Sequence, residues 1–354
     1  MKVMIMFCVY ASLYFQCNNG ATNLPKDVVV PAVIAFGDSV LDPGNNNYIN
    51  TVTKANFPPY GKDFIGRKPT GRFGNGKIIS DFLAKALGVK EYVPAYLDPS
   101  LQDKDLLMGV SFASAGSGYD PLTSTLASVI PLAAQLDMFK DYIEKLKRIV
   151  GEEAAKNIIT NSVYFISAST NDFLTNYYSY RFRRLQYDLP AYCNKLAEFA
   201  TSSIQELHKL GARRIIVFSS STIGCIPFER TVHGGPNRKC VHKYNKAAQV
   251  FNDILKEHLQ ILSSSFPESR IASLDFYNPM ISIMKNPRLY GLDVVDEGCC
   301  GTRNVEMGYF CNMLTKLCKN DSKFFFWDSL HPSEKGSEIL TNLVVPELMK
   351  SLFY

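Results

Sequence analysis

Five short apolar runs, rich in β-branched residues, are separated by longer segments in which apolar residues recur with helical spacing. The runs cover residues 28–36, 109–113, 162–167, 213–219 and 270–276. Helical spacing covers residues 76–87, 130–150, 192–210, 241–262 and 333–352. Strands that alternate with helices in this way predict a parallel sheet with helices on both faces. The chain is therefore expected to be an α/β protein.

Hydrophobic residues make up 46% of the 354 residues, which is enough for a large core and argues against disorder. We find no repeat and no low-complexity linker, and we predict a single domain over residues 28–354. The formal charge is only +5. Arg181, Arg183 and Arg184 form the densest basic cluster, whereas nucleic-acid binding usually needs a larger basic stripe. No nucleic-acid partner is expected.

The first residues are typical of an export signal. Lys2 precedes an apolar run over residues 3–15, which is shorter than the roughly 20 residues that a bilayer-spanning helix needs. We predict a secretory signal peptide over residues 1–21, with an unclear cleavage site; a buried N-terminal helix is the alternative. No later segment of the sequence has the length and apolar character of a membrane anchor.

Seven cysteines follow the predicted signal peptide: Cys193, Cys225, Cys240, Cys299, Cys300, Cys311 and Cys318. Export makes disulfides plausible, and the odd number leaves at least one thiol free or paired between chains. The cluster over residues 299–318 lacks the C-x₂₋₄-C pairs of zinc sites, so we expect no metal and no cofactor. Asn320, in an Asn-Asp-Ser tripeptide, is a candidate glycosylation site.

Three loops that follow the first three apolar runs carry residues suited to acyl transfer. Ser39 follows the first run, Gly116 the second and Asn171 the third. In parallel sheets the ligand site lies beyond the carboxyl ends of the strands, so we expect these loops to converge on one edge. Backbone N–H groups of Ser39 and Gly116 and the Asn171 amide could stabilise an oxyanion. Gly116 could instead permit a tight turn, and Asn171 could form an Asx turn.

A serine nucleophile needs a base, and His331 is the best candidate of the five histidines. It follows the aromatic run at residues 324–327, and Asp328 lies three residues before it. Asp328 would orient the imidazole and stabilise its charged form. Alternatively, Asp328 brackets the last helix and His331 is a half-buried turn residue. Asp42 and residues 45–47 are expected to orient or build their loop rather than contact substrate.

These residues lie in four blocks that resemble, in order, those of the GDSL (SGNH) hydrolase family and its plant esterase/lipases. The blocks are residues 36–46, 112–118, 170–172 and 328–332. The resemblance implies a triad of Ser39, Asp328 and His331, with Ser39, Gly116 and Asn171 as oxyanion donors. Two positions depart from the family pattern, and both carry serine. Ser111 replaces an asparagine, and Ser169 replaces a glycine, which leaves the orientation of Asn171 open.

The resemblance further implies a three-layer α/β/α, flavodoxin-like sandwich with a five-stranded parallel sheet. It implies a secreted serine carboxylic-ester hydrolase that acts through an acyl-enzyme on a lipid or other acyl ester, that is, a small-molecule or lipid substrate. The expected location is extracellular, in the apoplast or cell wall if the source is a plant. An acyltransferase with the same site and a non-catalytic secreted binding protein are the alternatives. The aromatic stretch at residues 176–182 either lines an acyl pocket or packs on its own domain.

Overall fold

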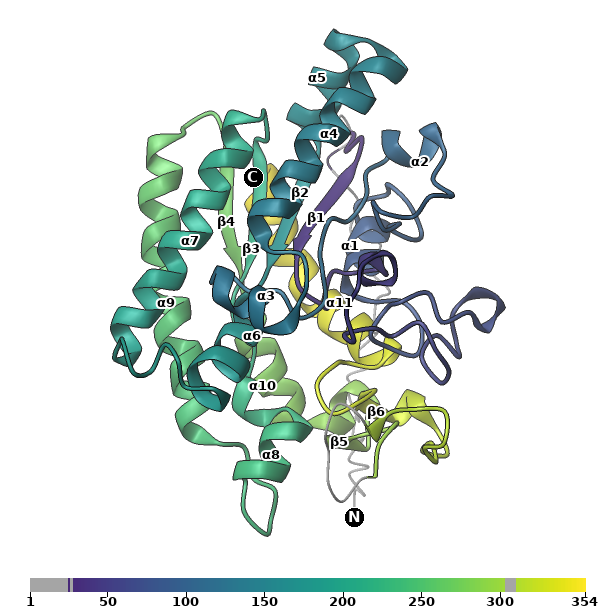
Figure 1. The fold of residues 1–354 in the computed structure, drawn as a ribbon, viewed down its shortest axis with the longest axis vertical. Coiled ribbons are helices and arrows are strands. Elements are labelled where there is room, and N and C mark those ends of the chain that lie inside the picture. Colours follow the sequence, from purple (N-terminus) through teal and green to yellow (C-terminus); the bar gives the residue numbers. More distant parts are fainter. Residues whose placement is uncertain (1–24, 26–27, 303–309) are drawn as a thin grey trace, which may run out of the picture.

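A computed structural model describes residues 25, 28–302 and 310–354, so the expected signal peptide at residues 1–21 lies outside the described residues. A parallel sheet forms the centre of the described structure (Figure 1). The strands, in spatial order, are β1 (Val33–Gly37), β2 (Val163–Ser167), β3 (Arg214–Phe218) and β4 (Arg270–Leu274). Their side chains are largely buried on both faces, as expected for a sheet that helices cover on both sides.

The remaining predicted strand, at residues 109–113, is reduced to isolated parallel bridges at one residue, Ser111, which pairs with Ala35 and with Ala95. Backbone hydrogen bonds run from Ala35 N–H to Val110 O at 3.2 Å and from Phe112 N–H to Ala35 O at 2.8 Å. Gly109, with φ of +86°, turns the chain out of the extended conformation just before the bridge. This segment still lies beside β1, so the spatial order follows the flavodoxin-like pattern 2-1-3-4-5.

Helices cover both faces of the sheet, which confirms the predicted three-layer α/β/α fold (Figure 1). One face carries α4 (Leu132–Val150), α7 (Leu189–Lys209) and α9 (His242–Ser265), and the other carries α1 (Ile79–Ala86) and α11 (Glu334–Phe353). The shorter helices are α2 (Asp103–Leu107), α3 (Pro121–Ala127), α5 (Glu152–Asn161), α6 (Ser169–Asn171), α8 (Pro227–His233) and α10 (Tyr277–Lys285). Among the described residues no single helix is long and apolar enough to cross a membrane; the bent pair of α3 and α4 qualifies only when both are taken together.

Packing of apolar faces, in addition to capping of the helix ends, stabilises the long helices. On α7 the buried side chains recur at intervals of three and four residues, and they pack on α9. The stripe on α7 includes Leu196, Ala200, Ile204 and Leu207, and that on α9 includes Phe251, Leu255, Leu259 and Leu262. Burial of one such leucine contributes about 1.5–3 kcal/mol. Asp188 caps α7 by accepting the Ala191 N–H at 2.9 Å.

A second sheet, of two parallel strands, was not predicted. It pairs β5 (Val294–Gly298) with β6 (Phe324–Phe326). Two disulfides, Cys299–Cys318 and Cys300–Cys311, lie in the segment between these strands, and Cys225–Cys240 closes another loop. Among the described cysteines only Cys193 is unpaired, and it is buried. The odd cysteine count is thus resolved by a thiol inside the core.

Candidate active site

Ser39 lies two residues beyond the end of β1, where the backbone turns sharply. Gly37 has φ of +125°, and a Cβ at this position would collide with the Ser167 carbonyl oxygen. The buried Gln135 side chain of α4 accepts the Gly37 N–H at 2.7 Å and donates to its carbonyl at 2.9 Å. A glycine is therefore required here, and the strand end that presents Ser39 is fixed from two sides.

Ser39 meets His331, although 292 residues separate them in the chain. His331 Nε2 lies 2.8 Å from Ser39 Oγ, and Nδ1 lies 2.9 Å from Asp328 Oδ2. The backbone N–H groups of Leu330 and His331 donate to Asp328 Oδ1 at 2.8 and 2.7 Å. The turn thus wraps around the carboxylate and aims the imidazole at the serine hydroxyl.

Asp328 is held as a carboxylate despite being only 2% exposed. Burial pushes its pKa upward, but the charge and hydrogen bonds of His331 and the Leu330 N–H outweigh this effect and lower the pKa below its usual value. An ionised Asp328 can fix the tautomer of the imidazole and stabilise its charged form.

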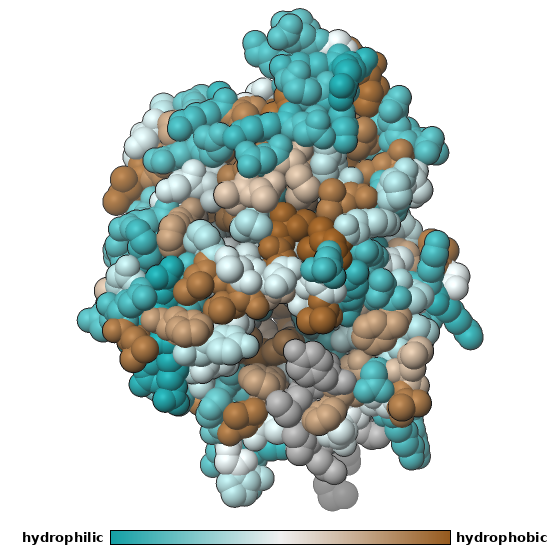
Figure 2. Space-filling model, in the orientation of Figure 1, coloured by the Kyte–Doolittle hydropathy of each residue, from teal (hydrophilic) through white to brown (hydrophobic). Residues whose placement is uncertain are grey.

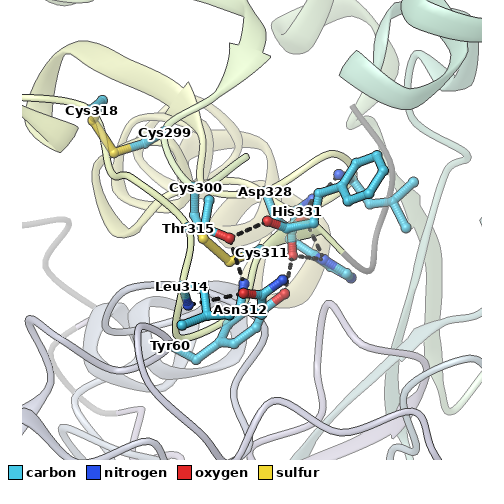
Figure 3. Close-up of a disulfide and its surroundings, with 12 residues drawn as sticks. Tyr60, Cys299, Cys300, Cys311, Asn312, Leu314, Thr315, Cys318, Asp328 and His331 are labelled. Carbon is cyan, nitrogen blue, oxygen red and sulfur yellow. Dashed lines mark hydrogen bonds and ion pairs between the residues drawn. A yellow bond between two sulfur atoms is a disulfide. The ribbon is translucent and has the colours of Figure 1, made fainter. Parts of the chain in front are cut away.

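Tyr60 is a site residue that the sequence did not indicate. Its hydroxyl donates to Asp328 Oδ2 at 2.8 Å, next to the Cys300–Cys311 disulfide (Figure 3). The ring is 4% exposed and packs edge-on against Trp327 at a centroid distance of 6.5 Å. The two residues are 268 positions apart, and nothing in the proline-rich segment around Tyr60 points to a carboxylate partner.

The expected oxyanion donors differ in how they are placed. Among the described residues, the backbone N–H groups of Ser39 and Gly116 have no hydrogen-bond partner. Asn171 Nδ2 donates to the Ser117 carbonyl at 2.9 Å, which leaves its second hydrogen for another acceptor. Ser169 opens the short helix α6 and therefore needs no glycine-like backbone. The replacement of the family's glycine thus imposes no backbone strain beside Asn171.

Asp42 and its neighbouring asparagines connect the first block to the second. Asp42 Oδ1 accepts the N–H groups of Gly44 and Asn45 at 2.7 Å each, and Oδ2 accepts Ala115 N–H at 2.9 Å. Asn46 Nδ2 donates to the Ala115 carbonyl at 2.9 Å. These side chains do more than build their own turn, because they hold the loop that carries Gly116 against the loop that carries Ser39.

Asp172 connects the second block to the third. This buried carboxylate accepts the N–H groups of Tyr119 and Asp120 at 2.8 and 3.2 Å and the Thr123 hydroxyl at 2.6 Å. A Cβ at Gly118 would collide with it. Burial raises the pKa of Asp172 well above its usual value. The three loops are therefore fastened together by buried carboxylates that lie behind the candidate donors.

A cavity of about 80 Å³ lies beside Ser39, Asn171 and His331. Apolar side chains gather around a hollow near α6 on this face of the molecule (Figure 2). The apolar part of the cavity lining consists of Val40, Ile79, Leu174, Phe218, Ile226, Phe276, Met280, Leu330, Pro332 and Leu340. Gly116 is not part of the lining, nor is any residue of the aromatic stretch at 176–182. In that stretch Tyr177 stacks on Tyr192 at 5.0 Å.

Sequence comparison places the chain among known enzymes. The GDSL-like lipase/acylhydrolase family model matches residues 33–344. The chain belongs to this family. As expected from the sequence, this protein is a member of a family of carboxylic ester hydrolases.

Relatives from Arabidopsis thaliana match this protein over nearly its whole length. GDSL esterase/lipase At5g42170 is 44% identical over 334 residues, covering 94% of this chain and 90% of the relative. GDSL esterase/lipase At1g20120 is 46% identical, with coverages of 92% and 81%. GDSL esterase/lipase EXL3 is 43% identical, with coverages of 96% and 93%.

Proposed function

We propose that this protein is a serine esterase that forms an acyl-enzyme on Ser39. The contact of 2.8 Å between Ser39 Oγ and His331 Nε2 carries the proposal. Ser39 Oγ attacks the carbonyl carbon of an ester while His331 Nε2 takes the hydroxyl proton. Asp328 holds the imidazole through Nδ1 and stabilises the positive charge that develops on it.

The resulting oxyanion is stabilised by the N–H groups of Ser39 and Gly116 and by the Asn171 amide, each worth about 3 kcal/mol. The bond between the carbonyl carbon and the alcohol oxygen then breaks, and His331 returns the proton to the leaving alcohol. Water attacks the acyl-enzyme, giving its proton to His331. The Ser39–acyl bond breaks, the acid departs and Ser39 regains its proton.

The proposed substrate is a lipid or other acyl ester outside the cell. Three disulfides support an oxidising compartment, and the apolar run at residues 3–15 supports export. We also propose a glycan on Asn320, which is exposed. Its Oδ1 accepts the Ser322 N–H at 3.2 Å, whereas Nδ2, the atom a glycan would occupy, has no partner among the described residues.

The Ser39→Ala variant tests the function. We expect kcat for p-nitrophenyl acyl esters to fall by a factor on the order of 10⁶, because no hydroxyl remains to attack. Ser80→Ala is the matched control, since Ser80 is also buried, its hydroxyl has no hydrogen-bond partner within the described part of the chain, and it lies in α1 outside the cavity lining. Near-UV circular dichroism would check that both variants fold. Hydrolysis by Ser39→Ala at the unmodified rate would refute the proposal.

A further inference from the structure

We propose that the cavity beside Ser39 is an acyl pocket for short chains and that Met280 limits the chain length. The inference rests on the proposed function and names the substrate class for that same site. It predicts a preference for esters whose acyl group has about two to four carbons, as the cavity volume indicates.

The cavity leads from the reacting atoms into the interior. Ser39 follows β1, whereas the side chains of Phe218, Phe276 and Met280 come from the ends of β3 and β4 and from α10. These three side chains are only 3–4% exposed, so the far wall is closed to solvent. An acyl group bonded to Ser39 Oγ would therefore extend across the carboxyl ends of the strands toward this buried apolar wall.

The volume of the cavity limits the length of the acyl group that it can hold. The cavity measures about 80 Å³. An apolar cavity of about 150 Å³ is known to hold benzene, which has six carbons, so half that volume accommodates about three or four. Pockets for drug-sized ligands are several times larger, at about 300–1,000 Å³. A chain of eight or more carbons exceeds this volume, so it has to displace the wall or leave part of its length outside the cavity.

The side chains that form the far wall of the cavity differ in how easily they can move. Phe218 and Phe276 stack at a centroid distance of 4.3 Å, and Phe165 packs edge-on against Phe218 at 5.8 Å. These interlocked rings can move little. Met280 is unbranched and flexible, and it lies on α10 at 3% exposure. Truncating Met280 is therefore the single change that should lengthen the pocket with least effect on the rings.

The order of the reaction assigns the closed space to the acyl group rather than to the alcohol. The alcohol must leave before water reaches the acyl-enzyme, so it needs the open side of the site. The acyl group stays bonded to Ser39 Oγ through both steps and gains from burial of its carbons.

The first experiment needs no variant. Initial rates are measured with p-nitrophenyl acetate, butyrate, octanoate and laurate, which share one leaving group. We expect kcat/KM for octanoate to be at least about tenfold below that for butyrate, because extra methylenes do not fit a packed wall. Butyrate esters of ethanol, butanol and octanol should differ much less from one another. Octanoate or laurate turnover equal to that of butyrate would overturn the pocket.

The second experiment compares Met280→Ala with two controls. Met280→Ala should raise the octanoate-to-butyrate ratio of kcat/KM by about tenfold or more. Met280→Leu conserves volume and should keep the unmodified ratio. Met349→Ala removes the same atoms from α11, where Met349 is 7% exposed and outside the lining, and should also keep the ratio. An unchanged ratio in a folded Met280→Ala variant would refute the role of Met280.

The outcomes separate the two proposals. If hydrolysis depends on Ser39 but is indifferent to acyl length, the esterase stands and the short-chain pocket is wrong. If Ser39→Ala hydrolyses every ester as fast as the unmodified protein, the esterase itself is wrong.

Discussion

Asp328 receives donors from two distant parts of the chain. The Leu330 and His331 N–H groups and the imidazole come from its own turn, whereas the Tyr60 hydroxyl comes from 268 residues away. Phe73 packs on the imidazole at 4.8 Å. The orientation of His331 is thus set by contacts from the N-terminal third of the protein as well as by its local turn.

Removal of the Tyr60 hydroxyl should change the pH dependence of catalysis. In Tyr60→Phe the Asp328 carboxylate loses a donor, its pKa rises, and it holds the charged imidazole more firmly. We expect the acid limb of the kcat/KM profile to move to higher pH.

A pH series with p-nitrophenyl butyrate measures this shift. Tyr142→Phe is the control, because Tyr142 is buried, donates to the Leu106 carbonyl at 2.6 Å and lies outside the cavity lining. A Tyr60→Phe profile that superimposes on the unmodified one would show that the hydroxyl contributes only to packing.

The sequence located the candidate triad because two of its members are three residues apart and the third follows a strand. It could not locate Tyr60, because a tyrosine in a proline-rich segment looks the same whether its hydroxyl meets solvent or a carboxylate. Asp42 was expected to orient its own loop, but its hydrogen bond to the Ala115 N–H joins residues 73 positions apart, and no local sequence pattern indicates it. Hydrogen bonds between residues that only the tertiary fold brings together are thus the part of the candidate site that could not be predicted from the sequence.

At the level of elements, loops rather than strands carry the candidate site. Asp42 and Asp172 fasten the loops after β1, the bridging segment and β2 to one another through backbone N–H groups. Since the nucleophile and the donors sit on separate loops, their mutual distances depend on these carboxylates.

Asp42→Asn should loosen the second block. An amide nitrogen facing Ala115 N–H would place two donors together, so we expect the free energy of unfolding to fall by about 2 kcal/mol. We also expect kcat to fall more than KM changes, because the proposed oxyanion donors move while the cavity keeps its lining. Asp98→Asn is a matched control, since Asp98 Oδ1 accepts an N–H two residues ahead in the same way. Equal kcat in Asp42→Asn and the unmodified protein would contradict this role.

The sheet and its long helices were predicted because each is a local pattern repeated over many residues. The segment at 109–113 was predicted as a strand from its composition, but only Ser111 forms β-bridges there, after the positive φ of Gly109 interrupts the extended backbone. The pair of β5 and β6 was missed because β6 has three residues and β5 contains two acids. Short strands gain their stability from neighbours, which sequence periodicity does not reveal.

For the molecule as a whole, buried acids set the pH dependence of stability. Burial raises the pKa of Asp38 to about 7 and that of Asp42 to about 6, from a usual value of 3.8. Above pH 4 the unfolded chain therefore binds fewer protons than the folded chain at these sites. By linkage, stability falls as the pH rises toward the folded-state pKa values.

We expect the free energy of unfolding to be lower at pH 8 than at pH 5 by on the order of 4 kcal/mol, since the two folded-state pKa values lie about two units and one unit above pH 5. Urea unfolding at several pH values and constant ionic strength measures the slope. Asp38→Asn should flatten it, because an amide can still accept the Val40 N–H but does not titrate. Stability that rises from pH 5 to pH 8 would contradict the assignment.

The separation of Ser39 from His331 also has a consequence for biosynthesis. A ribosome makes the hydroxyl early and the imidazole 292 residues later, after all four strands of the main sheet. If the two groups act together, a nascent polypeptide cannot cleave esters in the compartment where it is made. A premature stop codon before position 331 would yield a product with its nucleophile but without its base.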